Sequence, residues 1–260
     1  ESGQTPEINL KAPPRELSLT PDITEQPYSE YNIQVTAEGF EAVLVSGSEI
    51  LAGAYSLQPI RMNPLDVTEE EEKVVVIPPH TLFGEYPPKI PEEEIKPMNE
   101  TGEIVLSRVV IPEYVIVHDG DPEDPTAKNY WVRYKDYIKN VASSEIYPTW
   151  TESAIYANIL VIQSFTLNRI FTEWYMGKGY DFTITSSTAY DQKWIYGRNV
   201  FEEIDYLVDS IFTNYLSRPG VRQPIFTSYC DGNRTYIFDL APPEIGMPPK
   251  TIATMMFIPI

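Results

Sequence analysis

The chain has 260 residues, 42% of them hydrophobic and 22% charged, which is enough to bury one large core or two modest ones. Its 38 acidic and 19 basic residues give a formal net charge of -19, which repels phosphate backbones and argues against nucleic acid as a ligand. The single cysteine, Cys230, excludes an intrachain disulfide framework and a cysteine-rich zinc site, and no apolar run approaches the roughly 20 residues of a membrane span.

The first 65 residues predict a β-rich segment. Strand-like runs lie at 7–10, 31–36, 41–45 and 57–62, and turn-forming residues separate them. The stretch YNIQVTAEGFEAVLVSGSEILAGAYSLQPIRMNPL resembles the later strands of a transthyretin-like (carboxypeptidase-regulatory-like) sandwich. The resemblance implies a partial β domain over 1–65. Since such a sandwich needs about seven strands, its opening strands were cleaved away, lie outside this sequence or come from another chain.

Residues 66–108 predict an extended, acidic, proline-rich linker between two domains. Runs of glutamate at 69–72 and 92–94, together with six prolines, resist a compact core. Within this linker, only 73–77 predicts a short strand.

The sequence pattern changes after residue 109, where strand-like residues and a turn rich in aspartate and proline precede three helical patterns. The helices are expected at 135–146, 152–175 and 200–216. The segment 181–199 is polar and aromatic without a helical period, as a binding loop would be. The whole chain is therefore predicted to be α+β, with a β-rich N-terminal part and a mainly helical domain with β additions over 109–260.

One stretch of the helical part carries the most specific motif. It reads YKDYIKNVASSEIYPTW and is followed by ESAIYANILVIQSFTLNR. This resembles SpoIID-type peptidoglycan lytic transglycosylase domains, in which a helix of the form D-Y-hydrophobic-K-x-V-x-x-x-E precedes a proline turn and a second helix. The matching positions are Asp136, Tyr137, Ile138, Lys139, Val141, Glu145 and Pro148, then Ala154, Ala157 and Asn158. The later stretches YDFTITSSTAYDQKWIYGRN and PIFTSYCDGNRT resemble the polar loop and glycine turn of the family.

Within that family, SSEIYPTW and TITSSTAYDQ look most like the clostridial spore cortex-lytic branch, where a transthyretin-like domain precedes the catalytic one. The resemblance implies cleavage of the bond between N-acetylmuramic acid and N-acetylglucosamine with formation of a 1,6-anhydro ring, in spore cortex degradation. It also implies peptidoglycan glycan strands as partner, an extracytoplasmic location in cell wall or spore, and no cofactor. An activating protease or an additional chain is left open as a further partner.

The resemblance makes Glu145 the catalytic acid, and its sequence surroundings fit that role. It ends a predicted helix and precedes Tyr147, Pro148 and Trp150. Desolvation and the negative end of a helix both raise the pKa of a carboxyl. A protonated carboxyl is what cleavage of a glycosidic bond requires. The residues alone leave open the alternative of an exposed carboxylate at a helix end.

Substrate-binding side chains are expected beside the acid, on the second helix and in the polar loop. The candidates are Ser144, Gln163, Ser164, Ser187, Thr188, Tyr190, Asp191 and Gln192. Gln163 and Ser164 stand where the family pattern has Arg and Thr, so details of the family's subsites are not carried over. Asp191 is either a second carboxylate or a residue that caps a turn.

No metal is expected, because the only histidines, His80 and His118, lie outside the loop in which some family members hold zinc. Two rival functions stay open. The missing arginine and a tail at 236–260 that departs from the family pattern favour a non-catalytic cell-wall or spore-coat binding protein. The other rival is a peptidoglycan hydrolase (muramidase) in which Asp191 activates water.

Overall fold

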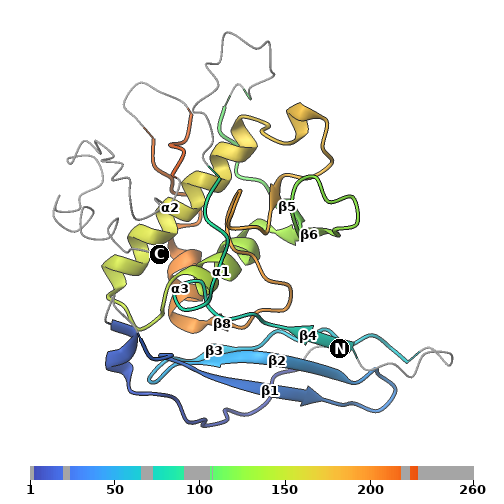
Figure 1. Cartoon of the computed structure of the whole chain (residues 1–260), viewed down its shortest axis with the longest axis vertical. Helices are drawn as coiled ribbons and strands as arrows, with labels where there is room; N and C mark the ends of the chain where they lie inside the picture. Colours follow the sequence, from blue (N-terminus) through green and yellow to red (C-terminus); the bar gives the residue numbers. More distant parts are fainter. Residues whose placement is uncertain are drawn as a thin grey trace.

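The computed structural model describes residues 3–19, 24–65, 73–90, 106, 108–217 and 223–227, and it combines helices with sheets, as α+β requires (Figure 1). The strands are β1 Ser29–Val35, β2 Val43–Ile50, β3 Ser56–Leu57, β4 Lys73–Val76, β5 Tyr114–His118, β6 Asn129–Arg133, β7 Ile184–Thr185 and β8 Val200–Phe201. The α-helices are α1 Tyr134–Glu145, α2 Glu152–Phe171 and α3 Glu202–Ile211, and two short 3-10 helices are η1 Arg15–Leu19 and η2 Met176–Lys178.

Three parts of the sequence-based predictions lie outside the described residues: the tail at 236–260, Cys230, and most of the predicted linker. Among the helices that are described, none combines the length and apolarity needed to cross a bilayer.

The N-terminal part forms a three-stranded sheet in the order β1-β2-β4, in which β2 pairs antiparallel with β1 and parallel with β4. The strands predicted at 31–36 and 41–45 are confirmed as β1 and β2, although β2 is longer. The strand predicted at 7–10 is wrong, because its apolar side chains contact no core: Ile8 is 73% exposed. Of the run predicted at 57–62, only Leu57 lies in a strand. That strand, β3, consists of Leu57 and the preceding residue Ser56.

The described part of the predicted linker belongs to the fold. Its short strand is confirmed as β4, and Ile77 continues along the sheet by donating its N–H to the carbonyl of Ser46 (2.8 Å). His80 is then fully buried, and the hydroxyl of Thr81 donates to the carbonyl of Ser144 in α1 (2.8 Å). Residues 73–90 therefore complete the sheet and cover the end of α1, which is more than a spacer does.

The second half sets a small sheet, β6-β5-β7, beside the three helices. Helix α1 begins at Tyr134, directly after β6 ends at Arg133, so strand and helix are continuous. The helix predicted at 135–146 is confirmed as α1. Helices α2 and α3 are also confirmed, but they end a few residues before the predicted ends at 175 and 216.

Helix α2 is the central element of the helical part. The side chain of Thr151 caps its N-terminus by accepting the N–H of Ala154 (3.3 Å), and most of the helix surface is buried, polar residues included. A helix buried all round must pair its polar side chains internally. This requirement decides the role of several candidate site residues.

The sheet of the N-terminal part and the helices share one core. Tyr28 and Leu51, which flank β1 and β2, are buried in the same cluster as Val141 of α1 and Val208 of α3. The short pairing of β3 with β8 links the two parts a second time. In Figure 1 the strands β1 to β4 lie along the underside of the helices. The segments predicted as separate domains thus contact each other through a continuous interior.

Candidate functional site

Glu145 is the last residue of α1, and its side chain is nearly buried, with 7% exposed. Its Oε1 accepts the backbone N–H of Lys193 at 2.7 Å. The carboxyl is therefore held by the segment 181–199, which the sequence predicts as a binding loop. A buried carboxyl in a fixed orientation is suited to transfer a proton to and from a bound group.

Helix α1 aligns this loop through a side-chain clamp. Asn140 donates from Nδ2 to the carbonyl of Ile195 (2.8 Å) and accepts the N–H of the same residue at Oδ1 (2.9 Å). One helical turn later, Ser143 offers its carbonyl to the guanidinium of Arg198 (3.0 Å from Nε). The loop thus runs along the C-terminal half of α1, which places the N–H of Lys193 at Glu145.

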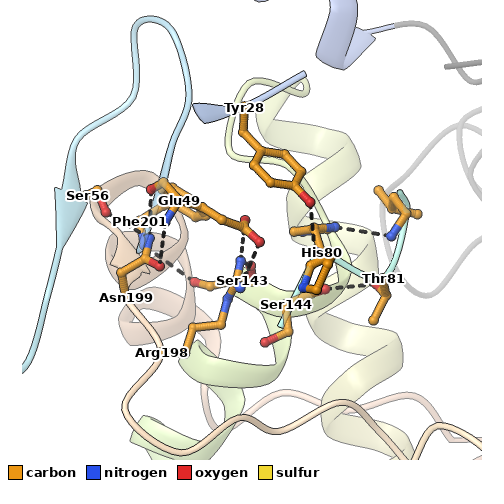
Figure 2. A network of polar contacts seen from close by, with 12 residues as sticks. Tyr28, Glu49, Ser56, His80, Thr81, Ser143, Ser144, Arg198, Asn199 and Phe201 are labelled. Atoms are coloured by element: carbon orange, nitrogen blue, oxygen red, sulfur yellow. Dashed lines mark hydrogen bonds and ion pairs between the residues drawn. The ribbon is translucent and has the colours of Figure 1, made fainter. Parts of the chain in front are cut away.

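A buried ion pair anchors the end of the loop to the N-terminal sheet (Figure 2). Arg198 donates from Nη1 and Nη2 to the two carboxylate oxygens of Glu49 in β2 (3.0 and 2.6 Å), and both side chains are fully buried. The adjacent Asn199 exchanges hydrogen bonds with the backbone of Glu49 (3.0 and 3.2 Å). A bidentate pair with every oxygen engaged fixes orientation strongly.

Lys193 and Asp119 bring further charge to the surroundings of Glu145. Burial lowers the pKa of the Lys193 ammonium, while the negative charges of Asp119 and Glu145 act in the opposite direction. The Nζ atom of Lys193 lies 5.2 Å from the centroid of the Tyr86 ring. Asp119 itself is exposed and accepts a hydrogen bond from the hydroxyl of Ser186 (2.8 Å).

Aromatic rings border the same region. Tyr130 packs against Trp194 and Tyr196, with ring centroids 5.3 and 5.0 Å apart, and the charge of Asp119 raises the pKa of Tyr130 after the larger effect of burial. Tyr130 and Tyr196 are partly exposed, so their faces are open to a ligand in part. The arrangement joins the ordered carboxyl of Glu145, the ammonium of Lys193 and several aromatic faces.

Three predicted substrate-binding residues beside the acid and on α2 are engaged inside the protein. Ser144 donates its hydroxyl to the carbonyl of Asn140 (2.9 Å), and Ser164 donates to Leu160 (2.6 Å) while accepting the N–H of Leu216 (2.7 Å). With its amide turned to suit its neighbours, Gln163 donates to carbonyls at the end of α3, the one of Ile211 at 3.1 Å. All three side chains are fully buried.

Asp191 forms the second buried ion pair. Its Oδ1 accepts Nε of Arg169 at 2.7 Å, and its Oδ2 accepts the hydroxyl of Tyr175 (2.7 Å) and both the N–H and hydroxyl of Thr185 (2.8 and 2.7 Å). The side chain has no exposed surface. These four hydrogen bonds engage both carboxylate oxygens inside the protein, so the position of Asp191 is explained by the fold alone.

The side chain of Gln192 is also engaged in hydrogen bonds inside the protein. Its Oε1 accepts the hydroxyls of Tyr137 (3.2 Å) and Thr166 (2.8 Å), and its Nε2 donates to the carbonyl of Ile162 (3.1 Å). The residue ties the loop to α1 and α2 and is 2% exposed.

The remaining predicted loop residues are closer to the surface. The carbonyl of Ser187 accepts the N–H groups of Tyr190 (3.1 Å) and Asp191 (2.7 Å), which closes a turn. The hydroxyl of Tyr190 binds Asp121, and that bond is the main cause of its raised pKa. Thr188 keeps a buried hydroxyl without a partner among the described residues. Ser187 and Thr188 are thus the predicted loop residues with side chains least committed to the fold.

Sequence reasoning missed Lys193, Asp119 and Asn140. Lys193 is 48 positions from Glu145 and Asp119 is 26 positions from it, and none of the three belongs to a spaced motif. Only the polar side chain of Asn140, five residues before Glu145 on the same helix, gives a local signal that α1 contacts another segment. Within the described ranges no three His, Cys, Asp or Glu side chains are grouped closely enough to hold a metal.

Comparison with known proteins gives no match to the chain among family models, curated proteins or solved structures.

Proposed function

We propose that this protein is a peptidoglycan lytic transglycosylase of the SpoIID type, with a transthyretin-like N-terminal part, and that Glu145 is its acid and then its base. The observation that carries the proposal is the position of Glu145. Its carboxyl is nearly buried at the end of α1 and is fixed by the N–H of Lys193, in the loop expected to bind substrate. The proposed setting is the cell wall or spore, with cortex degradation as the process.

The proposed reaction needs one carboxyl that changes its protonation state. Protonated Glu145 gives its proton to the glycosidic oxygen as the bond to the muramic acid C1 breaks, and a positively charged oxocarbenium-like centre develops. The carboxylate then accepts the proton of the 6-hydroxyl of the same sugar as that oxygen bonds to C1. The anhydro ring closes, the carboxyl regains its proton, and no water is consumed.

The contacts of Asp191 argue against the hydrolase alternative. A water-activating base must have a lone pair free to accept a proton. Asp191 accepts four hydrogen bonds and pairs with Arg169 in a buried position. The proposal therefore uses Glu145 as the single reacting carboxyl.

The proposal is tested by mass analysis of digested peptidoglycan, with cortex and vegetative wall in parallel. Wild type is expected to release products that end in 1,6-anhydro-muramic acid. Glu145→Gln removes the transferable proton with little change of shape, so product release should fall by at least about a thousandfold, within the range for loss of an essential acid. Glu152→Gln, which changes an exposed carboxylate at the start of α2, is the matched control and should match wild type.

Reducing ends in the products would replace the transglycosylase proposal with a hydrolase. A second candidate function is that of a non-catalytic cell-wall or spore-coat binding protein. One observation favours it: internal hydrogen bonds engage the polar side-chain groups of Gln163, Ser164 and Gln192. Sedimentation of the protein with intact wall, without release of any muropeptide, would favour this second function.

A further inference from the structure

The ammonium of Lys193 lacks an ion pair and a hydrogen bond within the described residues, although the side chain is partly buried. The neighbouring buried cations differ from it. Arg169 pairs with Asp191 at 2.7 Å and Arg198 pairs with Glu49 at 2.6 Å. Because withdrawing an unpaired charge from water costs free energy, a fold that needs no such charge would leave it at the surface.

The position of Lys193 ties this ammonium to the candidate acid. The N–H of the same residue donates to Oε1 of Glu145 at 2.7 Å, and Nζ lies over the ring of Tyr86 at 5.2 Å. Asp119 and Glu145 are the negative groups that act on the ammonium, and Arg198 is the positive one. Neither carboxylate lies within ion-pair distance, so the ammonium can still accept an anionic partner beside Glu145.

We propose that Lys193 binds a carboxylate on the lactyl-peptide arm of the muramic acid sugar and so selects carboxylated glycans over neutral amino-sugar polymers. This inference rests on the proposed function and names the substrate group recognised at that site. A protein with a formal charge of -19 repels an anionic polymer over most of its surface. The ammonium of Lys193, whose own N–H binds the reacting carboxyl, offsets that repulsion locally and sets the register of the sugar.

Binding measurements in the Glu145→Gln background test the inference without turnover. The ligands are peptide-free glycan and glycan with peptide stems, each with native or amidated carboxylates. Lys193→Met keeps the N–H that Glu145 accepts and an unbranched side chain over Tyr86. It should weaken binding of native glycan about tenfold, as expected for one charge-assisted hydrogen bond. Amidation of the glycan carboxylates should weaken binding to wild-type Lys193 by the same factor. Combining amidation with Lys193→Met should weaken binding no further than either change does alone.

Lys128→Met, which removes an exposed cation from the turn before β6, is the matched control. It should leave the difference in affinity between native and amidated glycan unchanged. If amidation weakens binding of peptide-free glycan, the contact is with the lactyl carboxylate. If amidation weakens binding only of glycan with peptide stems, the contact is with a carboxylate of the peptide. If Lys193→Met weakens native and amidated glycans equally, the inference is overturned, since the effect is then structural.

Kinetics separate this inference from the proposed function. In the presence of Glu145, Lys193→Met should raise KM for native glycan about tenfold with kcat unchanged, and Lys193→Arg should restore most of the loss. Cleavage by wild type with no KM change in Lys193→Met would overturn the role of Lys193 alone. Absence of cleavage by wild type would end the transglycosylase proposal, while the binding comparison would still decide the role of Lys193.

Discussion

The imidazole of His80 is fully buried between the N-terminal sheet and α1, where a charge is poorly tolerated. Its Nδ1 accepts the N–H of Leu82 (3.2 Å), so the proton of the neutral ring is on Nε2, which has no partner among the described residues. The ring packs against that of Tyr147 with centroids 4.4 Å apart and the planes tilted by 31°. Burial, and then the charge of Arg198, lower the pKa of His80 well below 6.5. The folded state therefore keeps this side chain neutral.

This makes stability dependent on pH in a defined direction. Below pH 6.5 the unfolded chain protonates His80 and the folded chain does not, so His80 stabilises the fold fully above that value and progressively less as the pH falls. The loss is at most about 1.4 kcal/mol for each pH unit. Urea unfolding at pH 7 and pH 5 should show a smaller pH effect for His80→Gln than for wild type. An identical change in the free energy of unfolding between pH 7 and pH 5 for the two proteins would contradict a neutral, buried His80.

At the scale of elements, the helices were predictable from the sequence because their apolar residues repeat over three or more turns. In α3, for example, Ile204, Leu207, Val208 and Ile211 are all buried, as the spacing indicated. Strands β3, β7 and β8 have two residues each, which is too short for an alternating pattern to be detected. Their pairing partners are distant in sequence, so tertiary contacts alone define them.

The candidate site was predictable only in its helical half. Glu145 was singled out by the resemblance of its helix to a known family pattern. Its partner Lys193 could not be, because tertiary contacts such as the clamp of Asn140 on the loop bring it close. The polarity of Asp191 and Gln192 was equally consistent with two roles: substrate binding and internal hydrogen bonding. Which of the two holds depends on how the loop packs against the buried helix α2, a tertiary contact that the sequence alone does not show.

Contact between the loop and β4 depends on the absence of a side chain at Gly197. Its φ is +73°, and a Cβ there would lie 2.5 Å from Cγ1 of Val75. Gly197→Ala is therefore expected to destabilise the protein by about 1–3 kcal/mol, the usual cost of overpacking, measured by urea unfolding. Combining it with Val75→Ala should remove the clash and leave the backbone strain. If Val75→Ala and Gly197→Ala act additively, the loop and the strand do not make this contact.

At the scale of the whole molecule, the ion pair of Glu49 with Arg198 joins β2 to the loop that orients Glu145. Arg198→Met leaves the Glu49 carboxylate buried without its partner, so the free energy of unfolding should fall by about 3–5 kcal/mol. Glu49→Gln should have an effect of the same sign. The double variant should recover part of the loss, because no unpaired charge is left inside.

The corresponding measurement is a double-mutant cycle by denaturant unfolding, with glycan cleavage followed in parallel. Lys135→Met, which loses a surface pair with Asp209 (3.2 Å, both side chains more than two-fifths exposed), is the control and should change stability by less than about 1 kcal/mol. Full additivity of the two single changes would contradict a direct pair between the sheet and the loop.

The parallel pairing of β2 with β4 has a consequence for a backbone cut between residues 65 and 73. The cut would separate β2 from β4 covalently, yet four residue pairs of the ladder, Val43 with Lys73 to Ser46 with Val76, would remain as contacts between two polypeptides. Each polypeptide alone would expose one half of the shared interior. Two fragments made separately should therefore recognise each other when mixed, as the halves of a split reporter do.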